Sequence, residues 1–133
     1  MNSKLFVTLV VFASLLLGGA VFAQGPNSAA QANLSEKETE WLQQIVDETV
    51  EPAKRVKAAQ ELAKSDCKAA KDNLLEMMKT DDTYQGRIVA AKALLDLGCK
   101  DALEAVEKQA ENDESPIVRN ALKGIAKRMH DLS

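Results

Sequence analysis

From Ser35 onward, apolar side chains recur every three or four residues, which is the spacing of the buried face of an amphipathic α-helix. Residues that begin or end helices separate these runs. Ser35 with Glu38 matches a capping box, Pro52 and Pro116 suit a first helical turn, and Gly98 suits the position after a last turn. No run shows the period-two alternation of a β-strand. We therefore predict an all-α fold of about six helices, whose buried faces carry these apolar residues: Trp41, Leu42, Ile45 and Val46; Val56, Ala59 and Leu62; Leu74, Leu75 and Met78; Ile88, Ala91, Leu94 and Leu95; Leu103, Val106 and Ala110; Val118, Leu122, Ile125 and Met129.

The same sequence pattern occurs twice at a spacing of 32 residues. Residues 55–59 (RVKAA) match residues 87–91 (RIVAA), and Cys67 and Cys99, each followed by Lys, keep the same spacing. A period of this size in a helical pattern is typical of stacked helical hairpins. We predict a short right-handed α-solenoid of antiparallel hairpins, with the second helix paired to the third and the fourth to the fifth. The first and sixth helices would then be unpaired, and we expect the C-terminal end to be either a docking surface or a site of self-association through the C-terminal helix.

The N-terminal residues have the composition of an export signal. Lys4 precedes an apolar run at residues 5–17, and Val21 and Ala23 supply the small residues that a signal peptidase requires. We predict a signal peptide at 1–23, cleaved before Gln24, a flexible linker at 24–34 and a repeat domain at 35–133. The expected location is the bacterial periplasm or the medium. The alternative is an uncleaved leader that anchors the protein to a membrane as a tethered spacer.

Composition narrows the class of partner. The chain has 17 Lys and Arg against 20 Asp and Glu, a net charge of −3, and loss of Lys4 with the leader would make it −4. An acidic balance argues against a nucleic-acid partner, which would require a concentrated basic surface.

The two cysteines leave two interpretations open. In an oxidising compartment a Cys67–Cys99 disulfide is expected, whereas equivalent positions of stacked repeats lie far apart for such a bond, which favours two buried thiols. Two sulfurs and the distant His130 do not make a metal site. No nucleophile–base set and no glycine-rich phosphate loop can be assembled, so we expect no catalytic residue and no cofactor.

Residues 87–128 (RIVAAKALLDLGCKDALEAVEKQAENDESPIVRNALKGIAKR) resemble HEAT repeats, and more narrowly the short HEAT-like type also found in phycobilisome lyases. The resemblance extends over about residues 52–128. It implies a structural polar ladder between repeats, for which the Asp–Arg pairs six residues apart are candidates. Thr49 stands where the acidic residue for Arg55 would fall, and Ala121 and Ile125 match the preceding repeat at 31 residues, which would shift Arg119. The candidate ladder residues are Asp81, Arg87, Asp113 and Arg119.

The resemblance also implies a function. In HEAT-like folds the second helices line a concave surface, here residues 68–79 and 100–111. We expect a non-catalytic scaffold or adaptor that binds a protein partner; the rival is an enzyme accessory or lyase-like protein. The exposed residues expected to meet the partner are Lys71, Glu76, Lys100, Glu104, Glu107 and Lys108.

Overall fold

The structure is a computed structural model that describes residues 33–132. The predicted signal peptide, its cleavage site and most of the predicted linker lie outside these residues. Residues 34–133 form one compact unit. Within the described part of the chain, no helix is both long enough and apolar enough to cross a membrane.

The all-α prediction is confirmed. The described residues form six α-helices and two short 3₁₀ turns, with no strand among them. In chain order the elements are α3 (Glu36–Gln44), α4 (Pro52–Lys64), η1 (Lys68–Ala70), α5 (Lys71–Thr80), α6 (Tyr84–Asp96), η2 (Lys100–Ala102), α7 (Leu103–Asn112) and α8 (Pro116–Asp131).

The residues at the helix starts explain where the helices begin. The backbone N–H of Ser35 donates to Glu38 at 3.0 Å and that of Glu38 donates to the Ser35 hydroxyl at 3.1 Å, which completes the predicted capping box. Thr83 caps α6 and Ser115 caps α8 through their side chains.

The two cysteines occupy the same place in the same helix-ending motif. Asp66 (φ 55°) and Gly98 (φ 69°) follow α4 and α6 in the left-handed conformation. The backbone N–H of Cys67 then donates to the carbonyl of Leu62 at 3.0 Å, and that of Cys99 to Leu94 at 3.1 Å. These are the long hydrogen bonds of a Schellman motif, in which the residue after the left-handed one packs against the helix. A small apolar residue suits that position, which accounts for the register of the cysteines.

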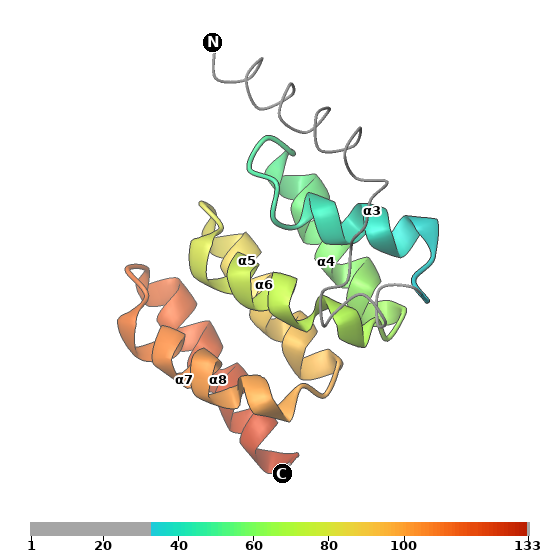
Figure 1. Ribbon diagram of the computed structural model, residues 1–133. Helices are drawn as coiled ribbons and strands as arrows, with labels where there is room; N and C mark the ends of the chain where they lie inside the picture. The colour runs from blue at the N-terminus through green and yellow to red at the C-terminus, as the bar shows by residue number, and fades with distance from the viewer. Residues whose placement is uncertain (1–32, 133) are drawn as a thin grey trace, which may run out of the picture. The chain divides into compact units, whose positions relative to one another are not determined.

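The helices pair differently from the prediction. α3 packs against α4, α5 against α6 and α7 against α8, which makes three hairpins (Figure 1). The expectation of two hairpins with an unpaired helix at each end is therefore wrong. It failed because the left-handed residue and the 3₁₀ turn redirect the chain between α4 and α5 and between α6 and α7, so that these helices belong to different hairpins.

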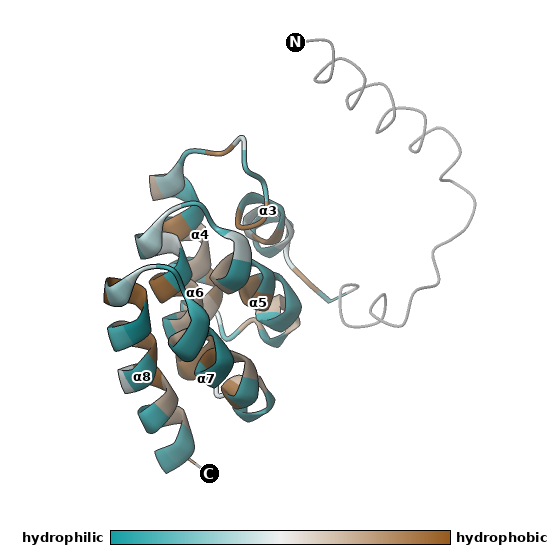
Figure 2. Cartoon of the chain, turned by 90° about the vertical axis from the view of Figure 1, so that its left-hand side faces the viewer, coloured by the Kyte–Doolittle hydropathy of each residue, from teal (hydrophilic) through white to brown (hydrophobic). Residues whose placement is uncertain are grey.

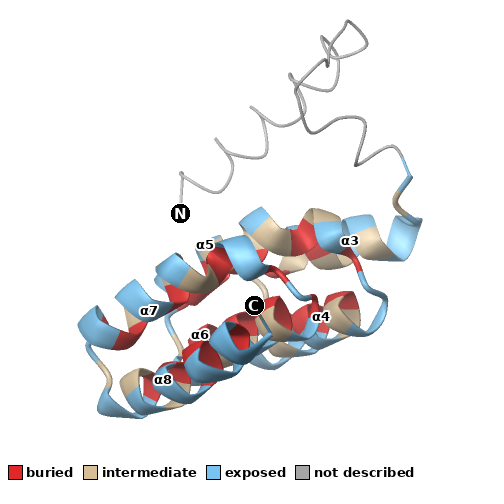
Figure 3. Cartoon of the chain, turned by 90° about the horizontal axis from the view of Figure 1, so that it is seen from below, coloured by how far each residue is buried: buried red, intermediate tan, exposed pale blue. Residues whose placement is uncertain are grey.

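The hairpins stack into two layers. Helices α4, α6 and α8 lie side by side in one layer, and α3, α5 and α7 form the other (Figure 3). Alanines that are 0–1% exposed face the core of the first layer at Ala58, Ala59, Ala90 and Ala91. Such small side chains allow helices to approach closely.

Apolar residues form the buried core between the layers, and the helices carry both apolar (brown) and polar (teal) residues along their length (Figure 2). Two expectations for single residues are corrected. Met77, which is absent from the predicted buried face of its helix, is 1% exposed because it packs inward beside Met78. Val46, predicted on the buried face, is 43% exposed because α3 ends at Gln44, before it.

Candidate functional site

A buried ladder of arginine and aspartate side chains joins the hairpins. Arg87 donates from Nε to Asp113 Oδ2 at 2.9 Å and from Nη2 to Asp113 Oδ1 at 3.1 Å. Its third bond goes from Nη1 to the backbone carbonyl of Asp81 at 2.9 Å. The side chains of Arg87 and Asp113 are 8% and 1% exposed. A bidentate pair this deeply buried fixes both distance and orientation between neighbouring hairpins.

The preceding rung repeats this geometry. Arg55 Nε donates to Asp81 Oδ2 at 2.9 Å, and Arg55 Nη1 donates to the carbonyl of Val50. Each arginine thus binds the carboxylate 26 residues ahead of it and a carbonyl five or six residues behind it. The six-residue Asp–Arg spacing therefore reflects a hydrogen bond from the arginine side chain to the backbone carbonyl of the aspartate, and not a contact with its carboxylate. Thr49 does not replace the partner of Arg55, because that partner is Asp81.

Arg119 continues the ladder in the unshifted register. Its Nη1 donates to the carbonyl of Asp113, as Arg87 donates to the carbonyl of Asp81. The two arginines are therefore equivalent at 32 residues, and the 31-residue alignment of the last helix is wrong. That alignment matched Ala121, which is only half-buried, to the buried Ala90. At a spacing of 32 residues Ala90 corresponds to the buried Leu122, so α8 keeps both the ladder register and most of the core-facing positions of α6.

The ladder aspartates are held ionised. Burial alone would raise the pKa of Asp113, but the N–H of Ser115 and the side chains of Arg87 and Gln109 outweigh it, so that the pKa is lowered. The pKa of Asp81 is lowered in the same way, against the effect of its burial, by Arg55 and Thr83. Every buried side-chain nitrogen or oxygen in the described residues has a hydrogen-bond partner. The ladder is a saturated structural network with no group left over for a reaction.

Gly86 is required by the close approach of the ladder to α6. A Cβ atom at this residue would lie 2.4 Å from the carboxylate carbon of Asp81. The sequence pattern did not single out this glycine, because the contact is made across a loop.

The expected disulfide is absent. Cys67 and Cys99 are both free and buried, and they are not at disulfide distance. Their Schellman motifs belong to successive stacked repeats, which separates the two sulfurs. Burial raises the pKa of both thiols, with carboxylates nearby adding to the effect, so neither has the character of a reactive thiolate.

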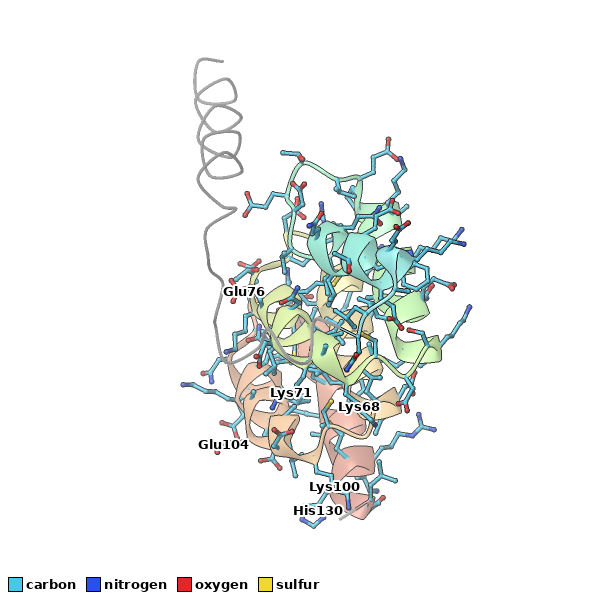
Figure 4. The ribbon with its side chains drawn as sticks, turned by 45° about the vertical axis from the view of Figure 1, so that its right-hand side comes forward. Lys68, Lys71, Glu76, Lys100, Glu104 and His130 are labelled. Carbon is cyan, nitrogen blue, oxygen red and sulfur yellow. The ribbon has the colours of Figure 1, made fainter. Side chains whose placement is uncertain are left out.

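The six residues expected to meet a partner lie on or next to α5 and α7, where Figure 4 labels Lys71, Glu76, Lys100 and Glu104. Whether they meet a partner stays a prediction, and their surroundings differ. Lys71 bridges repeats through a 2.5 Å ion pair with Asp101. This pairing raises the pKa of Lys71 and lowers that of Asp101. Glu107 lines a depression between α7 and α8 at the end of the stack. Glu76, Lys100, Glu104 and Lys108 are exposed.

The end of the stack beside α7 and α8 is polar. The positions that in the preceding repeat hold Leu75, Ile88, Ala91 and Leu95 hold Glu107, Asn120, Lys123 and Lys127. The apolar stripe of α8 is covered by α6 and α7, and its exposed large apolar residues, Ile117 and Leu132, lie at opposite ends of the helix. A polar outer face is characteristic of a terminal repeat. The polar end gives no support to docking or self-association through α8, which stays a prediction.

Charged side chains are distributed unequally between the two layers. Apart from the ladder arginines, α4, α6 and α8 carry seven Lys and Arg against three Asp and Glu. Helices α3, α5 and α7 carry four Lys against eight Asp and Glu. A protein with a net charge of −3 therefore has one basic layer.

A shallow groove lies between α4 and α6 on the basic layer. It encloses about 430 Å³ and is bordered by Lys64, Lys92 and Asp96, with Ala63 and Val89 also lining it. No group of three metal-ligating side chains occurs among the described residues. His130 is exposed in the last turn of α8.

A family model for HEAT repeats matches residues 39–126, which is most of the chain. The protein belongs to the HEAT-repeat family. Neither curated proteins nor solved structures show a significant match to it. HEAT repeats commonly mediate protein–protein interactions and are generally non-enzymatic, and the six-helix stack described above is a short α-solenoid of this family.

Proposed function

We propose that this HEAT-repeat protein is an exported, non-catalytic adaptor that binds a protein partner on an outer face of its helical stack. The observation that carries the proposal is the Arg–Asp ladder. It joins successive hairpins through buried, bidentate contacts from Arg55 and Arg87, so that the outer helices keep one arrangement. A surface that is already ordered loses little conformational entropy on binding.

The other features of the molecule agree with a binding role. The buried polar groups are occupied by one another, the cysteines are buried thiols, and the end beside α8 is polar. Within residues 33–132, the two extended outer faces are the surfaces left for binding a partner. Export is supported by the leader-like composition of residues 1–23.

The test is recovery of a partner by the tagged full chain expressed in its native cell, followed by reconstitution of the purified pair. We expect a stoichiometric complex that leaves both chains chemically unchanged by mass spectrometry. A variant with the ladder broken, Arg87→Met, should bind more weakly. Turnover of the recovered protein, or failure of the purified pair to associate, would refute the adaptor role.

Export has a separate test. N-terminal sequencing of the mature protein should begin at Gln24. A sequence beginning at Met1 or Asn2 would show instead that the leader is retained.

A further inference from the structure

We infer that the outer face of α4, α6 and α8 binds an acidic segment of another protein. This inference rests on the proposed adaptor function and specifies the chemistry of its partner. It moves the binding surface away from α5 and α7, where the helical order alone placed it.

Charge is segregated between the two layers. Seven basic residues on this layer stand against three acidic ones, while the opposite layer has an excess of four acidic residues. If these side chains served only to keep the protein soluble, we would expect basic and acidic residues to be mixed on each layer, which is not the case. An acidic ligand is therefore attracted to one layer and repelled by the other.

The cations of this layer are also free to bind a ligand. Lys64 forms a 3.3 Å ion pair with Glu61, which is an exposed and weak contact. The remaining six form no ion pair within residues 33–132, and all are exposed: Lys54, Lys57, Lys92 and Arg128, together with Lys123 and Lys127, which lie toward the end of the stack beside α7. On the opposite layer, by contrast, Lys71 is already engaged with Asp101.

The shape and lining of the surface suit a peptide. The groove between α4 and α6 places Lys64 and Lys92 beside the small apolar side chains of Ala63, Val89 and Ala93. An extended peptide can lay an apolar side chain in the groove while its carboxylates meet the lysines. Tyr84 and Ile117, two of the four exposed large apolar residues in the described chain, lie at the starts of α6 and α8 in the same layer.

Acidic protein fits this surface better than nucleic acid. Asp96 lies in the groove itself and Glu61 lies on α4 nearby, and both would repel a continuous phosphate backbone. The layer has a single exposed aromatic residue, Tyr84, whereas single-stranded nucleic acid is usually bound by several stacking side chains. A peptide can space its carboxylates to match the lysines and offer amide N–H groups to Asp96.

The experiment uses the full chain, a twelve-residue peptide of Glu, Asp and Leu, and two charge-reversal variants. The test variant is Lys57→Glu/Lys64→Glu/Lys92→Glu on the basic layer. The matched control is Lys37→Glu/Lys79→Glu/Lys108→Glu, exposed lysines of α3, α5 and α7 that change the net charge by the same amount. Circular dichroism confirms that both variants are folded.

We expect the peptide to shift backbone amide NMR signals of α4, α6 and α8, and its affinity to fall as salt screens the exposed charges. The test variant should lose affinity by at least about tenfold, equivalent to about 1.4 kcal/mol, and the control by less than about threefold. Equal losses in both variants would show that only net charge matters and would overturn the inference. So would shifts confined to α5 and α7, tighter binding of oligo-dT or phosphatidylglycerol vesicles, or self-association of the unliganded chain.

Failure of this inference is distinguishable from failure of the adaptor function. A purified natural partner that binds the test variant as tightly as the unaltered chain overturns only the choice of surface. If no purified partner binds either form, the adaptor function itself fails.

Discussion

Replacing Arg87 with methionine should destabilise the domain by about 3 kcal/mol. Methionine keeps much of the aliphatic length of arginine, so the change removes chiefly the guanidinium. Two bonds to Asp113 and one to the carbonyl of Asp81 are lost together. Removing one partner of a buried ion pair costs about 3–5 kcal/mol. We take the lower limit because Asp113 still accepts hydrogen bonds from Gln109 and Ser115.

The assay is equilibrium urea unfolding followed by circular dichroism, supported by the melting temperature. For a domain of about 100 residues, 3 kcal/mol lowers the melting temperature by roughly 12–24 °C. The matched control is Arg119→Met. Arg119 makes one hydrogen bond, to the carbonyl of Asp113, and is only half-buried, so its loss should cost about 1 kcal/mol.

A double variant separates the ion pair from simple packing. In Arg87→Met/Asp113→Leu no charge is left buried, so the double variant should be more stable than Arg87→Met alone. The reasoning is refuted if Arg87→Met costs no more than Arg119→Met, or if the second substitution adds a further full penalty.

Four other predictions follow from the same structure. Gly86→Ala should destabilise the domain in urea unfolding because its Cβ would lie 2.4 Å from the Asp81 carboxylate carbon. Gly124→Ala, whose Cβ would have nothing within 4 Å, should stabilise the domain by about 0.5–1 kcal/mol. Similar effects on stability at the two sites would contradict this prediction. Because the pKa values of Asp81 and Asp113 are lowered in the folded protein, the two carboxylates stabilise it above the unfolded Asp pKa of about 3.9. This stability is lost as the pH falls through the lower folded values, so the free energy of unfolding should decline below about pH 4. An equally steep acid decline in Asp81→Asn/Asp113→Asn would exclude these groups as its source. Cys67 and Cys99 should react slowly with a thiol reagent in the native protein at pH 8, and both should react rapidly in urea. Fewer than two reactive thiols in urea would show that a disulfide had formed. The variant Asn120→Ile/Lys123→Ala/Lys127→Leu restores the residues of the preceding repeat and should make two copies of the protein associate through the end beside α8, as measured by sedimentation. A monomer at high concentration would show that the polar residues of this end are not what prevents association.

Much of the helical content followed from local chemistry. Ser35 with Glu38, and the prolines at 52 and 116, begin helices where their chemistry predicts, because capping depends on residues close in sequence. The hairpin pairing did not follow, since the left-handed Asp66 and the 3₁₀ turns after both cysteines decide it. Aspartate gives only a weak sequence signal for that conformation.

The contacts of the Arg–Asp ladder could not be predicted from the sequence either, because they join residues far apart in the chain. The residues Asp81, Arg87, Asp113 and Arg119 could be named from their spacing, but the bonds could not. Arg55 and Asp81 are 26 residues apart and meet only because hairpins stack. The basic layer could not be predicted either, because the lysines of α4, α6 and α8 lie on one layer only in the folded stack.

Hydrogen exchange of the domain, free and bound to its purified natural partner, tests the adaptor account most directly. The account predicts slowed exchange on an outer face of the stack, with the buried amides around Leu62, Leu94 and Leu122 unchanged because the stack is already rigid. Slowed exchange throughout the core would mean that the domain folds on binding, and unchanged exchange on both outer faces would mean that neither is the binding surface. Either result would contradict a preformed scaffold.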